Sequence, residues 1–126
     1  MTYVEINNNR YVATIGGKMH DREWNDRESK YIHAEMTYNE AISNFIDGAN
    51  WSIVQIDEVE VEKHDDKGNV YMDVEKIENV FDNSEFNIAG EVIDHRDGTV
   101  TIKMGKPNEL EVALSTIDEI LIAMEE

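Results

Sequence analysis

The sequence lacks cysteine altogether, has one proline, and contains only 11 lysines and arginines against 28 aspartates and glutamates. The absence of cysteine excludes disulfides, thiolate metal sites and cysteine nucleophiles, and it agrees with synthesis in a reducing compartment. The formal charge of −17 makes direct binding to nucleic acid or to an anionic membrane electrostatically unfavourable. A basic protein is the partner that this charge favours.

Long apolar runs are also missing. The first thirty residues contain no run typical of a signal peptide, and no stretch approaches the roughly 18 apolar residues of a spanning helix. The 126 residues are therefore expected to form one soluble domain. Residues 1–107 are expected to be mainly β-structure and residues 108–126 to be a helix.

Short β-favouring runs separated by turn residues predict a series of hairpins. Asn7-Asn8-Asn9, Asp65–Asn69 and Asp97-Gly98 are the expected turns, whereas Gly16-Gly17 and residues 79–83 are expected to interrupt strands. The predicted strands cover residues 3–6, 11–15, 29–36, 51–61, 70–74, 86–93 and 99–104.

Two helices are predicted. Thr37 and Glu40 have the spacing of a capping box, which starts a helix of about ten residues. From Asn108 onward apolar residues recur at the spacing of one helical face, although Ser115-Thr116 with Glu119 could cap a second helix and divide it. Ile120 and Ile122 lie outside that stripe and indicate a second packing surface, such as another subunit. The alternative is that the sheet surrounds this helix on several sides and no partner is needed. The predicted fold class is α+β, with a mainly antiparallel sheet of six or seven strands, a short internal helix and a C-terminal amphipathic helix. The expected core contains Phe45, Trp51, Ile53, Ile88, Val92 and Ile102.

Acidic residues are concentrated in the second half of the chain, and Glu58, Glu60 and Glu62 alternate along one predicted strand. Alternation places these three carboxylates on one face, and Asp73 and Glu75 are added by the opposite hairpin arm. One interpretation is a solvated arm whose like charges protect an exposed edge from pairing. The other is a docking surface for a basic protein.

A second candidate surface is the segment from Asp21 to Lys30, in which Arg22, Trp24 and Arg27 lie among carboxylates. One interpretation is a salt-bridged loop with Trp24 plugging the core, and the alternative is a protein-binding loop.

Motifs for catalysis are absent from the sequence, and we expect neither an enzyme nor a cofactor. Its four histidines have no helical metal-ligand spacing. His33 and Glu35 share a strand face but form a pair that alternation produces by chance, and His64 precedes acidic residues suited to a turn. We therefore expect no catalytic residue and no functional metal.

Several segments together resemble a group of small uncharacterised phage and prophage proteins from Gram-positive bacteria, encoded near tail genes. The resemblance covers most of the chain and is carried by Ala13–Lys18, Asp21–Lys30, Asp47–Ile53, Ala89–Val100 and Met104–Pro107. It implies a tail-associated structural or adaptor protein that is made in the host cytoplasm and has a role either in the virion or in its assembly. It brings no catalytic residues with it.

Two functions follow as expectations. The first is a non-enzymatic phage protein that binds a tail protein or a second copy of itself. The alternative is an acidic inhibitor, in one version a nucleic-acid mimic, that binds a basic host defence protein. Neither function involves direct contact with nucleic acid or membrane. The candidate protein-binding residues are Arg22, Trp24, Arg27, Glu58, Glu60, Glu62, Ile120 and Ile122.

Overall fold

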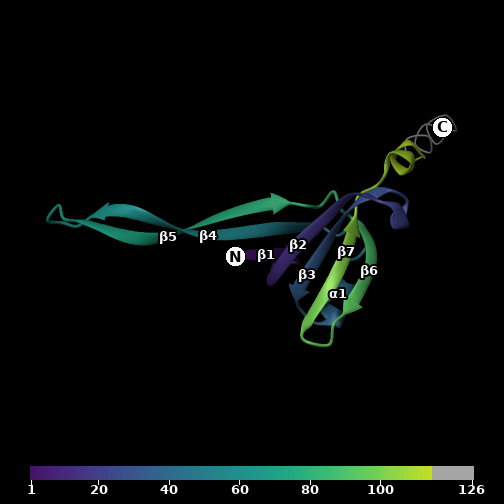
Figure 1. Cartoon of the computed structure of the whole chain (residues 1–126), viewed down its shortest axis with the longest axis horizontal. Helices are drawn as coiled ribbons and strands as arrows, with labels where there is room; N and C mark the ends of the chain where they lie inside the picture. The colour runs from purple at the N-terminus through teal and green to yellow at the C-terminus, as the bar shows by residue number, and fades with distance from the viewer. Residues whose placement is uncertain (115–126) are drawn as a thin grey trace, which may run out of the picture.

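The computed structural model describes residues 1–114, which form a single antiparallel sheet of seven strands (Figure 1). The strand order is β5-β4-β1-β2-β3-β7-β6, so β5 and β6 form its edges. The prediction of an antiparallel sheet of hairpins is confirmed, but the fold is mostly β rather than α+β because the described helical segments are few and short. The strands are β1 (Thr2–Ile6), β2 (Asn9–Asp21), β3 (Arg27–Glu35), β4 (Trp51–His64), β5 (Val70–Asp82), β6 (Ile88–Asp94) and β7 (Thr99–Gly105).

The first hairpin turns at Asn7 and Asn8, which both adopt positive φ angles of 51° and 66°. Asparagine tolerates this left-handed conformation, which suits a two-residue hairpin turn. The expected break at Gly16-Gly17 is wrong, because β2 continues to Asp21. It changes partner instead, pairing with β1 up to Val12 and with β3 from Ala13 onward.

The hydrophobic core lies on one face of this sheet, where α1 (Tyr38–Asn44) contacts β6 and β7. Trp51, Phe45 and Ile102 are buried as predicted, and Ile53 and Val92 pack against them while partly exposed. Ile88, also expected in the core, is only half-buried. Trp51 donates a hydrogen bond from Nε1 to the carbonyl oxygen of Phe86 at 2.9 Å, so its polar atom is satisfied inside the core.

The capping box at Thr37 is confirmed. The Thr37 hydroxyl accepts from the backbone N–H of Glu40 at 3.1 Å, and the Glu40 carboxylate accepts from the Thr37 N–H at 3.3 Å. The helix is shorter than predicted, because Phe45 leaves the helical conformation and packs edge-on against Trp51. Ile42 and Ile46, which the sequence pattern placed on the apolar stripe, are exposed.

Strands β4 and β5 extend well beyond the rest of the sheet (Figure 1). The break expected at residues 79–83 is wrong for most of that range, because β5 runs to Asp82 and pairs with β4 throughout. Strand β1 accompanies β4 only as far as Gln55, so residues 57–78 form a two-stranded ribbon, at whose base Glu78 forms an ion pair with Arg10 of β2. We call residues 57–78 the arm. The eight residues that β4 contributes to it, 57–64, correspond to a length of about 27 Å.

The C-terminal helix begins at Glu109, on the side of the body away from the arm (Figure 1). Asn108 precedes it as an N-cap, since its side-chain oxygen accepts from the Glu111 N–H at 2.9 Å. The rest of the predicted helix, including Ile120 and Ile122, lies outside the described residues. Among residues 1–114 no helix is long and apolar enough to cross a membrane.

Candidate protein-binding surfaces

The end of β2 carries a buried carboxylate, Asp21, which ties three neighbouring elements together. Its oxygens accept from Lys103 Nζ at 2.7 Å, from the Tyr31 hydroxyl at 2.9 Å and from the Ser29 hydroxyl at 3.2 Å. The ammonium group of Lys103, helped by the two hydroxyls, lowers the pKa of Asp21 to about 2. The carboxylate is therefore fully engaged inside the chain.

Trp24 lies in a short 3₁₀ turn (Arg22–Trp24) directly after this carboxylate. The side chains of Arg27 and Lys103 each place a cation about 5.0 Å from the centre of the indole ring. The outer edge of the ring lies against Gly90 and Gly105, where a Cβ atom would approach it within 3 Å. Trp24 is half-buried on the rim of the sheet and does not belong to the core cluster, so it does not plug the core.

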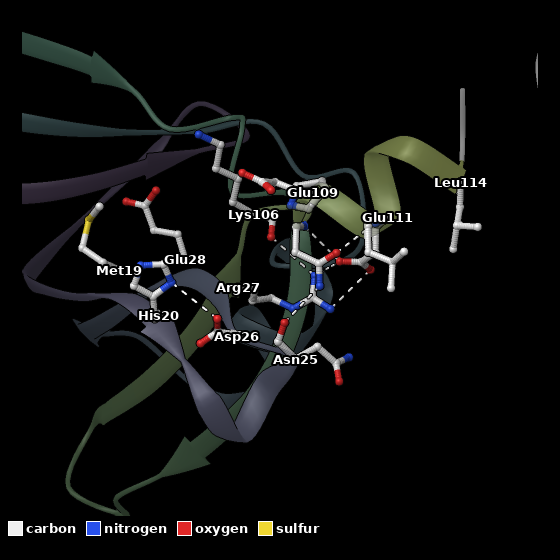
Figure 2. Close-up of a pocket in the computed structure, with 13 residues that line it drawn as sticks. Met19, His20, Asn25, Asp26, Arg27, Glu28, Lys106, Glu109, Glu111 and Leu114 are labelled. Carbon is white, nitrogen blue, oxygen red and sulfur yellow. Dashed lines mark hydrogen bonds and ion pairs between the residues drawn. The ribbon is translucent and has the colours of Figure 1, made fainter. Parts of the chain in front are cut away.

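Arg27 is buried and paired within the chain. Its guanidinium donates to both carboxylate oxygens of Glu111, at 2.6 and 3.3 Å (Figure 2). Arg27 Nε also donates to the Trp24 carbonyl at 3.1 Å. The Arg27 guanidinium holds the pKa of Glu111 below its usual range. This ion pair fastens the start of the C-terminal helix to β3, so Arg27 is already occupied. Arg22 is exposed and is the cation of this segment that remains open to a partner.

A groove of about 950 Å³ lies beside this ion pair (Figure 2). Met19, Pro107, Leu110 and Leu114 supply its apolar lining, and Arg27 is among its polar residues. Met19 and Leu110 are about 70% exposed. The groove is shallow and open, and the segment that follows Leu114 lies outside the described residues.

The arm is the second candidate surface, and its strand register distributes side chains in an unexpected way. Glu58, Glu60 and Glu62 lie directly opposite Lys76, Val74 and Met72, so these six side chains share one face. The sequence pattern predicted that the carboxylates Asp73 and Glu75 add to this acidic row. They lie on the other face, opposite Val61 and Val59.

Each face of the arm consequently mixes carboxylates with apolar side chains. An ordinary surface hairpin packs one of its two faces against the rest of the protein. Neither face of this ribbon packs on the body, so both faces are exposed to solvent. On β5 all thirteen residues are exposed. The large apolar side chains among them in the arm are Val70, Tyr71, Met72, Val74 and Ile77, each between 45% and 59% exposed.

The sequence pattern did not identify these apolar residues as exposed, although the length of the turn at the tip of the arm indicates it. The turn is closed by Asp65, whose backbone N–H donates to the Asn69 carbonyl and whose carboxylate accepts from the N–H groups of Lys67 and Asn69. A turn of this length pairs His64 with Val70. That register alone places Val59 and Val61 on the opposite face from Val70, Met72 and Val74.

The residues weighed as metal ligands separate in the structure. His33 and Glu35 lie on the exposed face of β3, while His64 is at the tip of the arm and Asp65 is used by the turn. Within residues 1–114 no three histidine or carboxylate side chains come together in an arrangement that would hold an ion.

Comparisons of the chain with protein-family models, with curated proteins and with solved structures gave no match.

Proposed function

We propose that this chain is a non-enzymatic structural or adaptor protein that acts through protein–protein contacts made by the arm. The observation that carries this proposal is the exposure of apolar side chains along both faces of a ribbon that projects from the body (Figure 1). Exposed apolar surface of this kind, rimmed by polar groups, marks an interaction site.

The arm contributes little to the stability of the isolated chain. A two-stranded hairpin is marginally stable in water, and nothing in the described core rests on residues 57–78. Burying a large aliphatic side chain contributes about 1.5–3 kcal/mol, so a partner that covers several of them recovers a substantial free energy. Part of that gain offsets the entropy lost on association.

The charge of the arm indicates the chemistry of its partner. Residues 57–78 contain nine acidic and three basic side chains, a net charge of −6. Two arms laid against one another would repel, which argues against a symmetric contact between copies through this surface. The complementary partner is a basic protein surface with apolar pockets between its cations.

The resemblance to tail-associated phage proteins implies a partner in the phage tail, and we propose that the arm binds there. The alternative, an acidic inhibitor of a host defence protein, uses the same negative charge. A nucleic-acid mimic, however, relies on carboxylates, whereas on this arm apolar side chains alternate with them on both strands. That alternation favours the structural role.

The experiment places a photo-crosslinking amino acid at Met72 in the arm and, in a matched variant, at Ile42, an exposed apolar residue of α1 on the body. Each variant is expressed in phage-infected host cells, and crosslinked proteins are identified by mass spectrometry. We expect one basic virion protein at position 72 and not at position 42.

Two further variants separate the roles of charge and apolar surface. Met72→Ser with Val74→Ser should abolish crosslinking at a neighbouring arm position, and Glu60→Gln with Glu62→Gln should weaken it while reducing its sensitivity to salt. Crosslinking of a host protein in place of a virion protein would select the inhibitor. Equal products from positions 72 and 42 would contradict an arm-mediated contact altogether.

A further inference from the structure

Two histidines that are distant in the sequence meet on the outer face of the sheet. His33 on β3 lies directly opposite Thr101 on β7 in the strand register. His95 follows the end of β6, in the turn toward β7, and reaches back to the same threonine. This juxtaposition depends on β3 pairing with β7, which sequence spacing does not reveal.

Both imidazole rings direct a nitrogen at one oxygen atom. His33 Nδ1 lies 3.3 Å and His95 Nε2 lies 2.7 Å from Thr101 Oγ1, and the ring centroids are 5.3 Å apart. A hydroxyl carries one hydrogen, so it can donate to only one of these nitrogens. The other nitrogen either donates to the oxygen or presents a lone pair there.

The surroundings of the pair are acidic. Glu35 is two residues from His33 on the same face, opposite Thr99. The Asp97 carboxylate accepts from the Thr99 N–H at 2.9 Å and lies two residues from His95 in the same turn. Arg96 belongs to the same turn, and Asp94 accepts from the Arg96 backbone N–H. With a chain charge of −17, the local potential attracts cations.

We propose that His33 and His95 form a two-imidazole chelate for a divalent transition ion such as Zn²⁺, Ni²⁺ or Cu²⁺. Imidazole nitrogens are ligands suited to these ions, and bond lengths near 2.0–2.1 Å require both nitrogens to approach a common point. They already converge on Thr101, and both histidines are exposed, so an ion can reach the two rings from solvent. The remaining coordination positions are open to water.

The ion would connect β3 to the β6–β7 turn, two elements that the sheet joins only through β7. Because the folded chain holds the two rings together and the unfolded chain does not, binding adds to stability by mass action. With two protein ligands, the affinity is expected to be lower than that of a closed four-ligand site.

The test is calorimetric titration of the purified full chain with ZnCl₂ in a buffer that does not bind metal. We expect one ion per chain, an increase of the melting temperature with added Zn²⁺, and weakening by at least about tenfold in His33→Ala and in His95→Ala. His64→Ala and His20→Ala remove the other two histidines and should bind as the wild type does. Circular dichroism before titration establishes that each variant is folded.

Copper supplies an independent readout, because the electron paramagnetic resonance spectrum of bound Cu²⁺ reports its nitrogen ligands. Two imidazole nitrogens in the wild type and one in each of His33→Ala and His95→Ala support the chelate. Zinc binding that is the same in His33→Ala and His95→Ala as in the wild type would overturn it, since the ion would then be held by surface carboxylates. Absence of binding to the folded wild type would overturn it equally.

Discussion

The body of the sheet and the arm are built from the same kind of alternating strand, yet one buries its apolar residues and the other exposes them. In the body, Ile53 lies opposite Val4 and Trp51 lies opposite Ile6, so apolar side chains of neighbouring strands meet on one face. In the arm every apolar residue of β4 lies opposite a carboxylate of β5. Alternation within one strand therefore does not create a core by itself. The register must also place the apolar residues of neighbouring strands opposite one another, on the same face of the sheet.

The body of the sheet therefore stabilises the fold, whereas the arm remains available for binding. The matched apolar faces of the body exclude water and lead to one stable arrangement, while each face of the arm mixes apolar and charged side chains. The substitutions below test this division between a stabilising body and a binding arm, beginning with the largest effect.

Trp51→Ala should be the most damaging substitution. Trp51 is 1% exposed, packs against Phe45 and donates to the Phe86 carbonyl, so its removal leaves a cavity and an unsatisfied acceptor. The expected loss is about 3–5 kcal/mol in the free energy of unfolding, measured with urea. Tyr71→Ala, an aromatic truncation in the arm, should change it by no more than about 0.5 kcal/mol. Similar losses for both variants would contradict the division.

Much of the body could be predicted from sequence because local signals and tertiary structure agree there. The asparagine turn, the capping box at Thr37 and the burial of Trp51 each depend on a few adjacent residues. The failures occur where pairing overrides a local signal. Gly16-Gly17 breaks no strand because β3 pairs along it, and Gly17 lies opposite Lys30.

The candidate surfaces were less predictable, because they depend on which strands are neighbours. The sequence identified the carboxylates of the arm but not their division between two faces, which the turn at Asp65 determines. It also paired His33 with Glu35 along one strand. The contact of His33 and His95 with Thr101 joins positions across the sheet and has no sequence signal.

Gly105→Ala should be the next most damaging change, with a loss of about 1–3 kcal/mol from overpacking. A Cβ atom at Gly105 would lie 2.7 Å from the Trp24 ring and from the Arg27 side chain, both of which are held by other contacts. Gly16→Ala is the matched control, because nothing lies within 4 Å of the corresponding Cβ position. Thermal unfolding of the two variants measures the difference. A loss at Gly16 as large as that at Gly105 would show that glycine flexibility, and not the close approach of Trp24, is responsible.

The Asp21 network should make the body sensitive to acid. A carboxyl whose pKa is lowered by folding, here to about 2, stabilises the fold above its unfolded pKa near 3.9. That contribution is lost as the pH falls from about 4 toward 2. Asp21→Asn should lower stability at neutral pH, since Lys103 loses its counter-charge, and should flatten the stability profile in this window. Glu58→Gln, which removes an exposed carboxylate of the arm, is the control. A profile for Asp21→Asn as steep as that of the wild type would show that other carboxyls cause the acid sensitivity.

Shortening the arm should have the smallest effect on stability and the largest on binding. Val59 and Glu75 face each other in register, so an Asn-Gly turn can join them in place of residues 60–74 without altering the pairing below. None of the deleted residues belongs to the core cluster, and a shorter connection costs less entropy to close. The free energy of unfolding should therefore change by no more than about 0.5 kcal/mol in urea titration. The shortened chain should also lose the virion protein that crosslinks at position 72 when the crosslinker is moved to Ile77, which the deletion retains. A clear loss of stability would mean that the arm stabilises the body. Unchanged crosslinking would mean that the retained residues at the base of the arm, and not the deleted residues 60–74, make the contact.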